Sequence, residues 1–260
     1  LDQLKKDGLS ENTIVVFFSD NGRLEARGIH WCFDSGLHVP MIISYPEKIA
    51  APRQVAPGKV NGQVLSLLDL TATTLFMAGI EKPVGMQSRV FLGPDAGPPR
   101  QFAFAARDRI DETVVWQRSV HGARYHYIRN GTPRAGFLTL NRYKEKCFLV
   151  KPLMRQLHAE GKLTGPPADL MEPFPTEMLF DTQADPHEVE NLADSRKPRH
   201  QRVLAEMRSA LDNWIVETGD RGHLLEPDEI VLPFIKEMHD WFGTPSWYKE
   251  PTPTISPRKQ

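Results

Sequence analysis

The chain has 260 residues, of which 25% are charged, and its formal net charge is −1 at pH 7. This balance excludes a strongly basic or acidic protein that would be drawn to nucleic acid or to a charged membrane surface. Two cysteines are too few for a disulfide framework, and no apolar run is long enough to predict a membrane-spanning helix. The chain begins with Leu1, in a stretch typical of the end of a helix, so we expect a piece of a longer protein.

Residues 13–45 predict a strand, an acidic turn, a polar loop and a second strand. The apolar run 14–18 shows no polar alternation, which is typical of a strand covered on both faces in an α/β sheet. Asp20 and Asn21 follow this run, so we expect them beyond the carboxyl end of the strand, where ligands bind in such sheets. Their side-chain oxygens predict part of a hard-metal site, and an Asx turn at the strand end is the alternative.

The rest of the chain alternates between helical and strand-like patterns. Apolar residues at helical spacing predict helices at residues 63–78, 148–160 and 201–218. Short runs of β-prone residues predict strands at residues 101–106, 114–120, 124–129 and 178–180. The two middle strands are expected to form a hairpin around His121 and Gly122.

These patterns predict three consecutive parts of the chain. Residues 1–110 would form an α/β sheet with flanking helices, and residues 111–218 a small antiparallel α+β subdomain. Residues 219–260 are rich in proline, and we expect a tail there, with residues 232–260 wrapping around the protein or fraying.

Several sequence blocks, taken together, carry a resemblance to a known family. They are residues 20–22, 33–40, 67–75, 124–128 and 177–193. An isolated Asp-Asn-Gly is an ordinary turn, but these blocks in this order and spacing resemble the sulfatases of the alkaline-phosphatase superfamily. The resemblance runs from Leu1 to about Trp214, and it implies part of an alkaline-phosphatase-like sheet with flanking helices, followed by a small C-terminal subdomain.

The resemblance implies hydrolysis of a sulfate ester in a sulfated small molecule or carbohydrate, by a periplasmic or secreted protein. Members of this family hold a divalent cation, usually Ca²⁺, and it neutralises the sulfate oxygens, so Asp20 and Asn21 would be metal ligands. Their nucleophile is a formylglycine, made from a Cys/Ser-x-Pro-x-Arg motif. No such motif occurs here, so we expect formylglycine upstream of this chain and no catalysis by the chain in isolation.

The loop between the two predicted strands departs from the family pattern. Sulfatases often carry a sulfate-binding Lys five residues before the acidic residue that corresponds to Asp34, and that position here is Ile29. The next residue, His30, is a candidate general acid because an imidazole titrates near neutral pH, and Arg27 or Arg23 would supply positive charge to the substrate. The alternative for His30 is a surface-loop histidine. Asp34 is expected to orient the loop.

Arginines further along the chain are candidates for anion binding. Arg107 and Arg109 follow the predicted strand 101–106, where two guanidinium groups could bind an anionic substrate. The alternative is a salt-bridged loop with neighbouring carboxylates. The hairpin arginines (Arg118, Arg124 and Arg129) and the charged run 142–146 are expected to face solvent.

The leading hypothesis is therefore an aryl- or carbohydrate-sulfatase, represented by its C-terminal portion. A second enzyme hypothesis is a phosphodiester or phosphonate monoester hydrolase of the same superfamily. A third is a non-catalytic scaffold that keeps the fold, for which Ile29 at the usual Lys position is the argument.

Overall fold

The computed structural model describes residues 1–248 except 50–51, 53, 55–56, 133–134 and 225. Contacts between residues divide the chain into two compact units. Unit 1 contains Leu1–Arg107, Gln117–Asn130 and Pro175–Asp220, and unit 2 contains Asp108–Trp116, Gly131–Phe174 and the described residues from Arg221 onward. The consecutive division predicted from the sequence, with boundaries near residues 110 and 218, stays a prediction.

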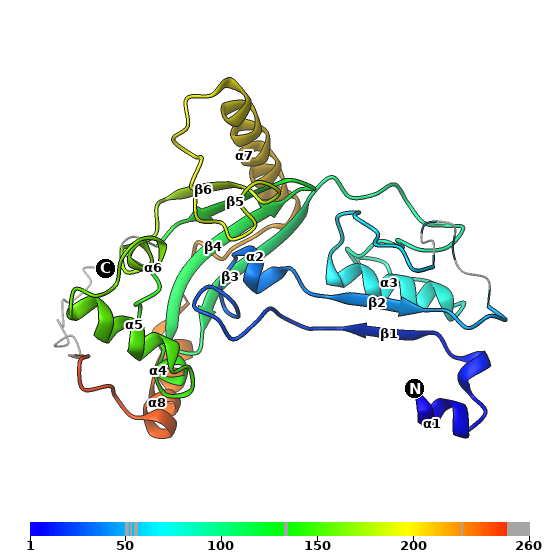
Figure 1. Ribbon diagram of the computed structural model, residues 1–260, viewed down its shortest axis with the longest axis horizontal. Helices are drawn as coiled ribbons and strands as arrows, with labels where there is room; N and C mark the ends of the chain where they lie inside the picture. The colour runs from blue at the N-terminus through cyan, green and yellow to red at the C-terminus, as the bar shows by residue number, and fades with distance from the viewer. Residues whose placement is uncertain (50–51, 53, 55–56, 133–134, 225, 249–260) are drawn as a thin grey trace. The chain divides into compact units, whose positions relative to one another are not determined.

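The chain contains both helices and strands (Figure 1). In chain order they are α1 (Asp2–Lys6), a short 3₁₀ helix (Ser10–Asn12), β1 (Val15–Phe18), α2 (Asp34–Leu37), β2 (Met41–Ser44), α3 (Leu67–Met77), β3 (Ala103–Ile110), β4 (Thr113–His121), β5 (Tyr125–Asn130), α4 (Arg142–Cys147), α5 (Val150–Ala159), α6 (Pro166–Asp169), β6 (Glu177–Asp181), α7 (Pro198–Thr218) and α8 (Asp228–Phe242). Among the described residues, no helix is both long and apolar enough to cross a membrane.

The strands β1 and β2 pair with each other in antiparallel register, from Val15 opposite Ser44 to Phe18 opposite Met41 (Figure 1). Asp20 and Asn21 follow β1 directly, as predicted. The expectation that this strand is covered on both faces is wrong for the part of the chain that is described, because Phe17 is 60% exposed. An apolar run shows what a strand can bury, but the segment that would cover it must come from elsewhere in the fold.

The helix α3 begins with a capping box, in which Ser66 and the side chain of Asp69 satisfy each other's backbone amides. Asp69 is only 1% exposed, and it also accepts hydrogen bonds from the Arg100 guanidinium at 2.5 and 2.6 Å and from the Arg89 amide at 2.8 Å. Burial alone would raise the pKa of the Asp69 carboxyl, but these donors outweigh it and hold the pKa below its usual value. The start of α3 is thereby tied to the segment that leads into β3.

The second sheet has the strand order β3-β4-β5-β6, with antiparallel pairing of β4 with β5 and of β5 with β6. In unit 1 the helix α7 packs against this sheet, and Figure 1 shows it beside β5 and β6. The core between them consists of apolar residues from both, which are Val120, Tyr125, Tyr127, Leu179, Leu192, Leu204, Met207 and Leu211. The hairpin and the amphipathic helix predicted from the sequence are confirmed.

The C-terminal region is more ordered than the sequence predicted. Residues 228–242 form α8, although Pro233 lies inside it, so the expected tail is wrong for these residues. The proline masked a helical pattern whose apolar residues recur on one face. The final residues of the predicted tail, 249–260, lie outside the described part of the chain.

Two further expectations about charged residues are wrong. Arg118 is only 1% exposed, and its guanidinium pairs with Asp220 at 2.5 and 2.7 Å. In unit 2, Arg142 and Lys144 of the predicted solvent-facing run are 3% and 4% exposed, and Arg142 pairs with Glu112 at 3.4 Å. A charge is buried where a partner is placed to neutralise it, and sequence spacing does not reveal that partner.

The substitution Asp69→Ala should lower the free energy of unfolding by about 3–5 kcal/mol, because it leaves the Arg100 guanidinium without its buried partner. The folded-state pKa of Asp69 is lowered, so this stabilisation is present above the unfolded pKa of about 3.9 and is lost as the pH falls through the folded value. Urea unfolding followed by tryptophan fluorescence should give a constant difference from wild type between pH 5 and 8, shrinking below pH 4.

The exposed Asp95 provides the control. Like Arg100, it lies in the segment between α3 and β3, and it has no recorded partner among the described residues. Asp95→Ala should leave the unfolding free energy within about 0.5 kcal/mol of wild type. An equal effect of the two substitutions would contradict the role given to the buried pair.

Candidate functional site

Residues 19–38, which we call the 19–38 loop, carry four of the predicted site residues, include α2 and lie between β1 and β2. The loop folds back on itself through backbone hydrogen bonds from the Gly22 amide to the Gly36 carbonyl at 3.0 Å and from the Ile29 amide to the Arg23 carbonyl at 2.9 Å. These bonds close the loop into a compact unit rather than an extended connection.

Glycines allow this close approach of backbone segments. A Cβ atom on Gly28 would lie 1.8 Å from the carbonyl oxygen of Arg23, and one on Gly36 would lie 2.4 Å from that of Trp31. Neither distance is possible for a real side chain, so only hydrogen fits at these positions. The shape of the loop therefore depends on its glycines as well as on its hydrogen bonds.

Asp20 and Asn21 lie at the start of the loop, as the predicted metal ligands. Asp20 is exposed, and no hydrogen bond or ion pair of its carboxylate is recorded with any described residue. Carboxylate and amide oxygens that have no recorded hydrogen bond suit a hard cation such as Ca²⁺, which takes six to eight oxygen ligands. The described residues contain no group of three or more His, Cys, Asp or Glu side chains placed to hold a metal ion, so this pair would supply only part of such a site.

His30, the predicted general acid, has a backbone φ of 79°, in the left-handed region that residues other than glycine rarely adopt. Such a conformation costs on the order of 1–2 kcal/mol, so the contacts around it must hold it in place. Its neighbour Trp31 is buried, and the Arg107 guanidinium stacks 3.9 Å from the Trp31 ring centroid. His30 itself is half-buried, which favours a defined position over a freely moving surface histidine.

Arg27 is tied to the turn that follows β6. Its guanidinium donates hydrogen bonds to the backbone carbonyls of His187 and Glu188, the latter at 2.6 Å, and lies 4.8 Å from the Phe33 ring centroid. Burial lowers the pKa of this guanidinium, although the charge of Glu188 opposes the shift. These contacts fix the position of the arginine, and its role in binding a substrate stays a prediction.

Arg107 and Arg109 lie inside β3, which continues to Ile110, and not at the end of a strand as the sequence predicted. Arg107 is buried against Trp31. In unit 2, Arg109 pairs with Glu226 at 2.5 Å and donates to the Asp111 carbonyl at 2.7 Å. The contacts of Arg109 favour a salt-bridged structural role over anion binding.

A cluster of histidines and carboxylates, which the sequence did not predict, joins the 19–38 loop to the β4–β5 hairpin. His121 and His126 are cross-strand partners with ring centroids 4.7 Å apart. His121 Nε2 contacts Asp34 Oδ1 at 2.8 Å, and His126 Nδ1 contacts Glu188 Oε1 at 2.5 Å. The Asp34 amide donates to Glu188 Oε2 at 2.8 Å, so both carboxylates belong to one network. The hairpin register would have predicted the histidine pair, but not its two acidic partners.

Asp34 orients the loop, as the sequence predicted, through hydrogen bonds with His121 and with His38 at 3.3 Å. Burial would raise the pKa of the Asp34 carboxyl, but the bonds from the two histidines outweigh it and hold the pKa well below its usual range. The same contact raises the pKa of His38. Asp34 is therefore a carboxylate over the whole physiological pH range.

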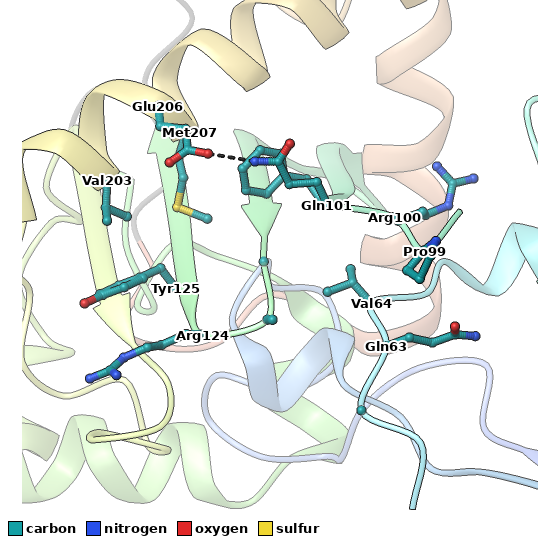
Figure 2. A pocket seen from close by; sticks show the side chains of 14 residues that line it. Gln63, Val64, Pro99, Arg100, Gln101, Arg124, Tyr125, Val203, Glu206 and Met207 are labelled. Atoms are coloured by element: carbon teal, nitrogen blue, oxygen red, sulfur yellow. Dashed lines mark hydrogen bonds between the residues drawn. The ribbon is translucent and has the colours of Figure 1, made fainter. Parts of the chain in front are cut away.

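Two of the cavities in unit 1 differ in size and in the residues that line them. The smaller, about 220 Å³, is lined by Arg27, Asp34 and Glu188 among others, so it adjoins the histidine–carboxylate cluster. The larger, about 370 Å³, lies between Val64 on one side and Tyr125 and Val203 on the other (Figure 2).

None of the predicted site residues lines the larger cavity. Two of its polar side chains are engaged with other residues: Gln101 with Glu206 at 2.7 Å, drawn as the dashed line in Figure 2, and Arg124 with Asp181 at 2.7 Å. Gln63 Nε2 and the Tyr125 hydroxyl are buried with no hydrogen-bond partner among the described residues. The 19–38 loop carries four of the predicted site residues, including the exposed Asp20 carboxylate, and we take it as the candidate functional site.

Known proteins are similar in sequence to this chain. Residues 1–80, which contain the 19–38 loop, match the sequence model of the family described as Sulfatase. An ulvan-active sulfatase from Formosa agariphila is 37% identical over 234 residues, which make up 88% of this chain and 37% of that protein. The chain belongs to the sulfatase family.

Other sulfatases align over a similar share of their length. The N-sulphoglucosamine sulphohydrolase of Homo sapiens is 28% identical over 236 residues, covering 85% of this chain and 45% of that protein. The solved structure of a 2-O GAG sulfatase superposes with a TM-score of 0.58 at 24% identity, covering 86% of this chain and 41% of the other. This likeness confirms the predicted alkaline-phosphatase-like α/β fold class. The chain spans about two fifths of the length of these sulfatases.

The loop glycines provide a test of the site geometry in this sulfatase-family chain. Gly28→Ala should lower the melting temperature by at least about 4 °C, because its Cβ would collide with the Arg23 carbonyl. Gly97→Ala is the matched control, since a Cβ there meets no atom within 4 Å. Differential scanning fluorimetry of both variants measures the difference, and an unchanged melting temperature for Gly28→Ala would show that the loop is not closed as described.

Proposed function

We propose that the protein containing this chain hydrolyses sulfate esters of carbohydrates, and that the 19–38 loop forms one side of its active site. The observation that carries the proposal is the pair Asp20 and Asn21, placed directly after β1 with no recorded partner for the Asp20 carboxylate. The carboxylates of the neighbouring cluster, Asp34 and Glu188, are by contrast hydrogen-bonded. An acidic side chain left uncommitted in an otherwise paired loop fits a metal ligand.

Asp20 and Asn21 would hold a divalent cation, Ca²⁺ by family resemblance, through a carboxylate and an amide oxygen. When bound, such a cation neutralises charge on the oxygens of a sulfate group. The formylglycine expected in this family has no matching motif among the 260 residues, so its source would lie outside them.

His30 would act on the leaving group. Expulsion of a sugar alkoxide is unfavourable unless its oxygen is protonated as the bond to sulfur breaks, and a half-buried imidazole can supply that proton. Arg27 would contribute positive charge from within the loop. Its guanidinium would remain hydrogen-bonded to the backbone of the turn after β6. Ile29, at the usual lysine position, would line the site without charge.

A carbohydrate substrate is supported by the names of the related proteins. One relative is named for activity on ulvan, another for N-sulphoglucosamine, and a structural neighbour is described as a 2-O GAG sulfatase. The test is sulfate release from sulfated oligosaccharides by the complete protein, with p-nitrophenyl sulfate and p-nitrophenyl phosphate as references. We expect sulfate release that a chelator abolishes and Ca²⁺ restores. Turnover of the phosphate alone would favour the phosphodiesterase alternative, and no turnover of any ester would favour a non-catalytic scaffold.

Asp20→Ala should lower kcat/KM for a sulfated oligosaccharide by at least about 100-fold and reduce the Ca²⁺ bound per protein, because a charged ligand is lost. Glu25→Ala removes a carboxylate from the same loop. The recorded side-chain contact of Glu25 is an exposed ion pair with Arg23. This control should keep both the activity and the bound metal, as measured by steady-state kinetics and elemental analysis. Full activity in Asp20→Ala would rule out its role as a ligand.

His30→Gly removes the imidazole and keeps a backbone that accepts the positive φ at this position. We expect kcat for a sugar sulfate to fall by roughly 10²–10⁴-fold, since general acid catalysis contributes about this much. The loss should be much smaller for p-nitrophenyl sulfate, whose leaving group needs little protonation. His158→Gly, on the exposed side of α5, is the control for histidine removal. Equal losses on both substrates would contradict a general acid.

A further inference from the structure

The residues that lead into α7 and form its first turns carry a dense cluster of positive charge. The four cationic side chains in residues 196–202 are those of Arg196, Lys197, Arg199 and Arg202. All four are exposed, and no ion pair of theirs is recorded among the described residues. Exposed charges are ordinarily satisfied by water, so this cluster marks a site only if another group beside it calls for a ligand.

The start of α7 adds to this positive charge. The helix dipole places a partial positive charge at the first turn, where acidic side chains are favoured in other helices. Here the first turn contains no acidic residue, and the side chain of the N-cap residue, Lys197, caps no backbone amide. The side chains and the helix start therefore both favour an anion at this end of α7.

The Tyr125 hydroxyl is the group that calls for a ligand. Tyr125 is only 9% exposed, and its hydroxyl is buried with no hydrogen-bond partner among the described residues. The guanidinium groups of Arg199 and Arg124 lie 5.5 and 5.6 Å from the centroid of its ring. Both groups are donors only, so neither can accept the hydroxyl proton. A buried donor beside two cations lacks an acceptor, and an anion would supply it.

These three groups come from neighbouring parts of unit 1. Tyr125 is the first residue of β5, and Arg124 precedes it in the β4–β5 hairpin. Figure 2 shows the Arg124 guanidinium and the Tyr125 hydroxyl extending in the same direction, below Val203 of α7. Arg199 lies four residues before Val203 and hence on the same face of the helix. The cavity of about 370 Å³ is lined by Arg124, Tyr125 and Val203, so there is space beside these donors.

The carboxylates nearby leave donors available. Nε and Nη2 of Arg124 donate to Asp181, but no hydrogen bond of its Nη1 is recorded among the described residues. Glu206, the acidic side chain on the same cavity, accepts a hydrogen bond from Gln101. Arg124 Nη1, the Tyr125 hydroxyl and the Arg199 guanidinium thus remain as donors for an oxyanion.

We propose that Arg124, Tyr125 and Arg199 form an anion site that binds a sulfate group of a sulfated saccharide chain. Guanidinium groups suit the oxygens of a tetrahedral oxyanion, and the phenolic hydroxyl would donate to one more oxygen. The exposed cations Arg196 and Arg202 would attract further sulfate groups along the same chain. The choice of a saccharide as the carrier of the sulfate rests on the proposed function.

This anion site is separate from the 19–38 loop. Successive residues of a strand point to opposite faces of its sheet. On β5, His126 contacts Glu188, which holds the loop, whereas Tyr125 packs in the core with residues of α7. A sulfate group bound beside Tyr125 would therefore not be the one that is cleaved, and it would anchor a polymeric substrate to the protein.

The test is isothermal titration calorimetry of the complete protein with an oligosaccharide of sulfated dextran, after treatment with a chelator so that binding is measured without turnover. Arg199→Gln should weaken binding by about tenfold, because a charge-assisted hydrogen bond is lost. Lys6→Gln is the matched control, since it removes one charge from an exposed lysine of α1 that has no recorded partner among the described residues. The control should bind within about twofold of wild type.

Tyr125→Phe separates ligand binding from a structural role, because it keeps the ring and removes the hydroxyl alone. Binding should weaken by about tenfold, as for loss of a hydrogen bond to a charged group. The melting temperature without ligand should be unchanged or higher, since a buried donor without an acceptor is removed. Wild-type affinity in Tyr125→Phe or Arg199→Gln would overturn the proposal. A clearly lower melting temperature of Tyr125→Phe, or an equal loss of affinity in Lys6→Gln, would overturn it too.

Three further titrations identify the carrier of the anion. Unsulfated dextran should not bind. Sodium sulfate and a single-stranded DNA oligonucleotide of the same charge should bind at least about tenfold more weakly than the sulfated oligosaccharide. Equal affinity for sodium sulfate would show a site for the free ion, and equal affinity for DNA a site for any polyanion. Either result would overturn the assignment to a saccharide.

The binding result and the activity result are independent. A protein that binds the sulfated oligosaccharide through these residues but cleaves no sulfate ester would keep the anion site and refute the proposed function. A protein that cleaves sulfate esters, with full oligosaccharide affinity in both variants, would keep the function and refute the anion site.

Discussion

The buried carboxylate of Glu188 holds the 19–38 loop in place, and the geometry of the candidate site depends on it. One of its oxygens accepts the Asp34 amide and the other contacts His126, while its own backbone carbonyl accepts the Arg27 guanidinium. A carboxylate only 3% exposed is costly to bury unless its oxygens are satisfied, so the loop cannot move away without leaving this charge unpaired. Glu188 adopts a φ of 52°, and these contacts compensate for that strained backbone.

The 19–38 loop is attached through Glu188, its backbone segments lie close together, and Asp20 near its start is exposed. Its glycines let backbone segments approach more closely than any side chain would allow, which gives the loop one shape. At the point where it leaves β1, however, the Asp20 carboxylate is exposed and uncommitted. A rigid loop that presents unpaired oxygens suits a cation site, because the ligands are held in position before the ion binds. Asp20 and Asn21 would supply two such ligands, and the proposed enzyme needs others.

Much of the fold could be predicted from local patterns. The apolar run before Asp20, the hairpin around Gly122 and the amphipathic helix α7 are all present as expected, because each is determined by the spacing of neighbouring residues. Helix α8 was missed because Pro233 is a strong signal against a helix, and packing outweighed it. Buried charges such as Arg118 were missed for a different reason. Their burial depends on a partner about a hundred residues away, and no local pattern records it.

The sequence by itself determined the family and the identity of the candidate metal ligands, since both rest on residue types in a fixed order along a short stretch. It also indicated that Asp34 orients the loop. Only the tertiary structure decided what Asp34 binds: a pair of histidines brought opposite each other by the hairpin, and a glutamate from the turn after β6. The reason is physical. Residue type sets which hydrogen bonds and charges a side chain can offer, but the fold sets which partners accept them.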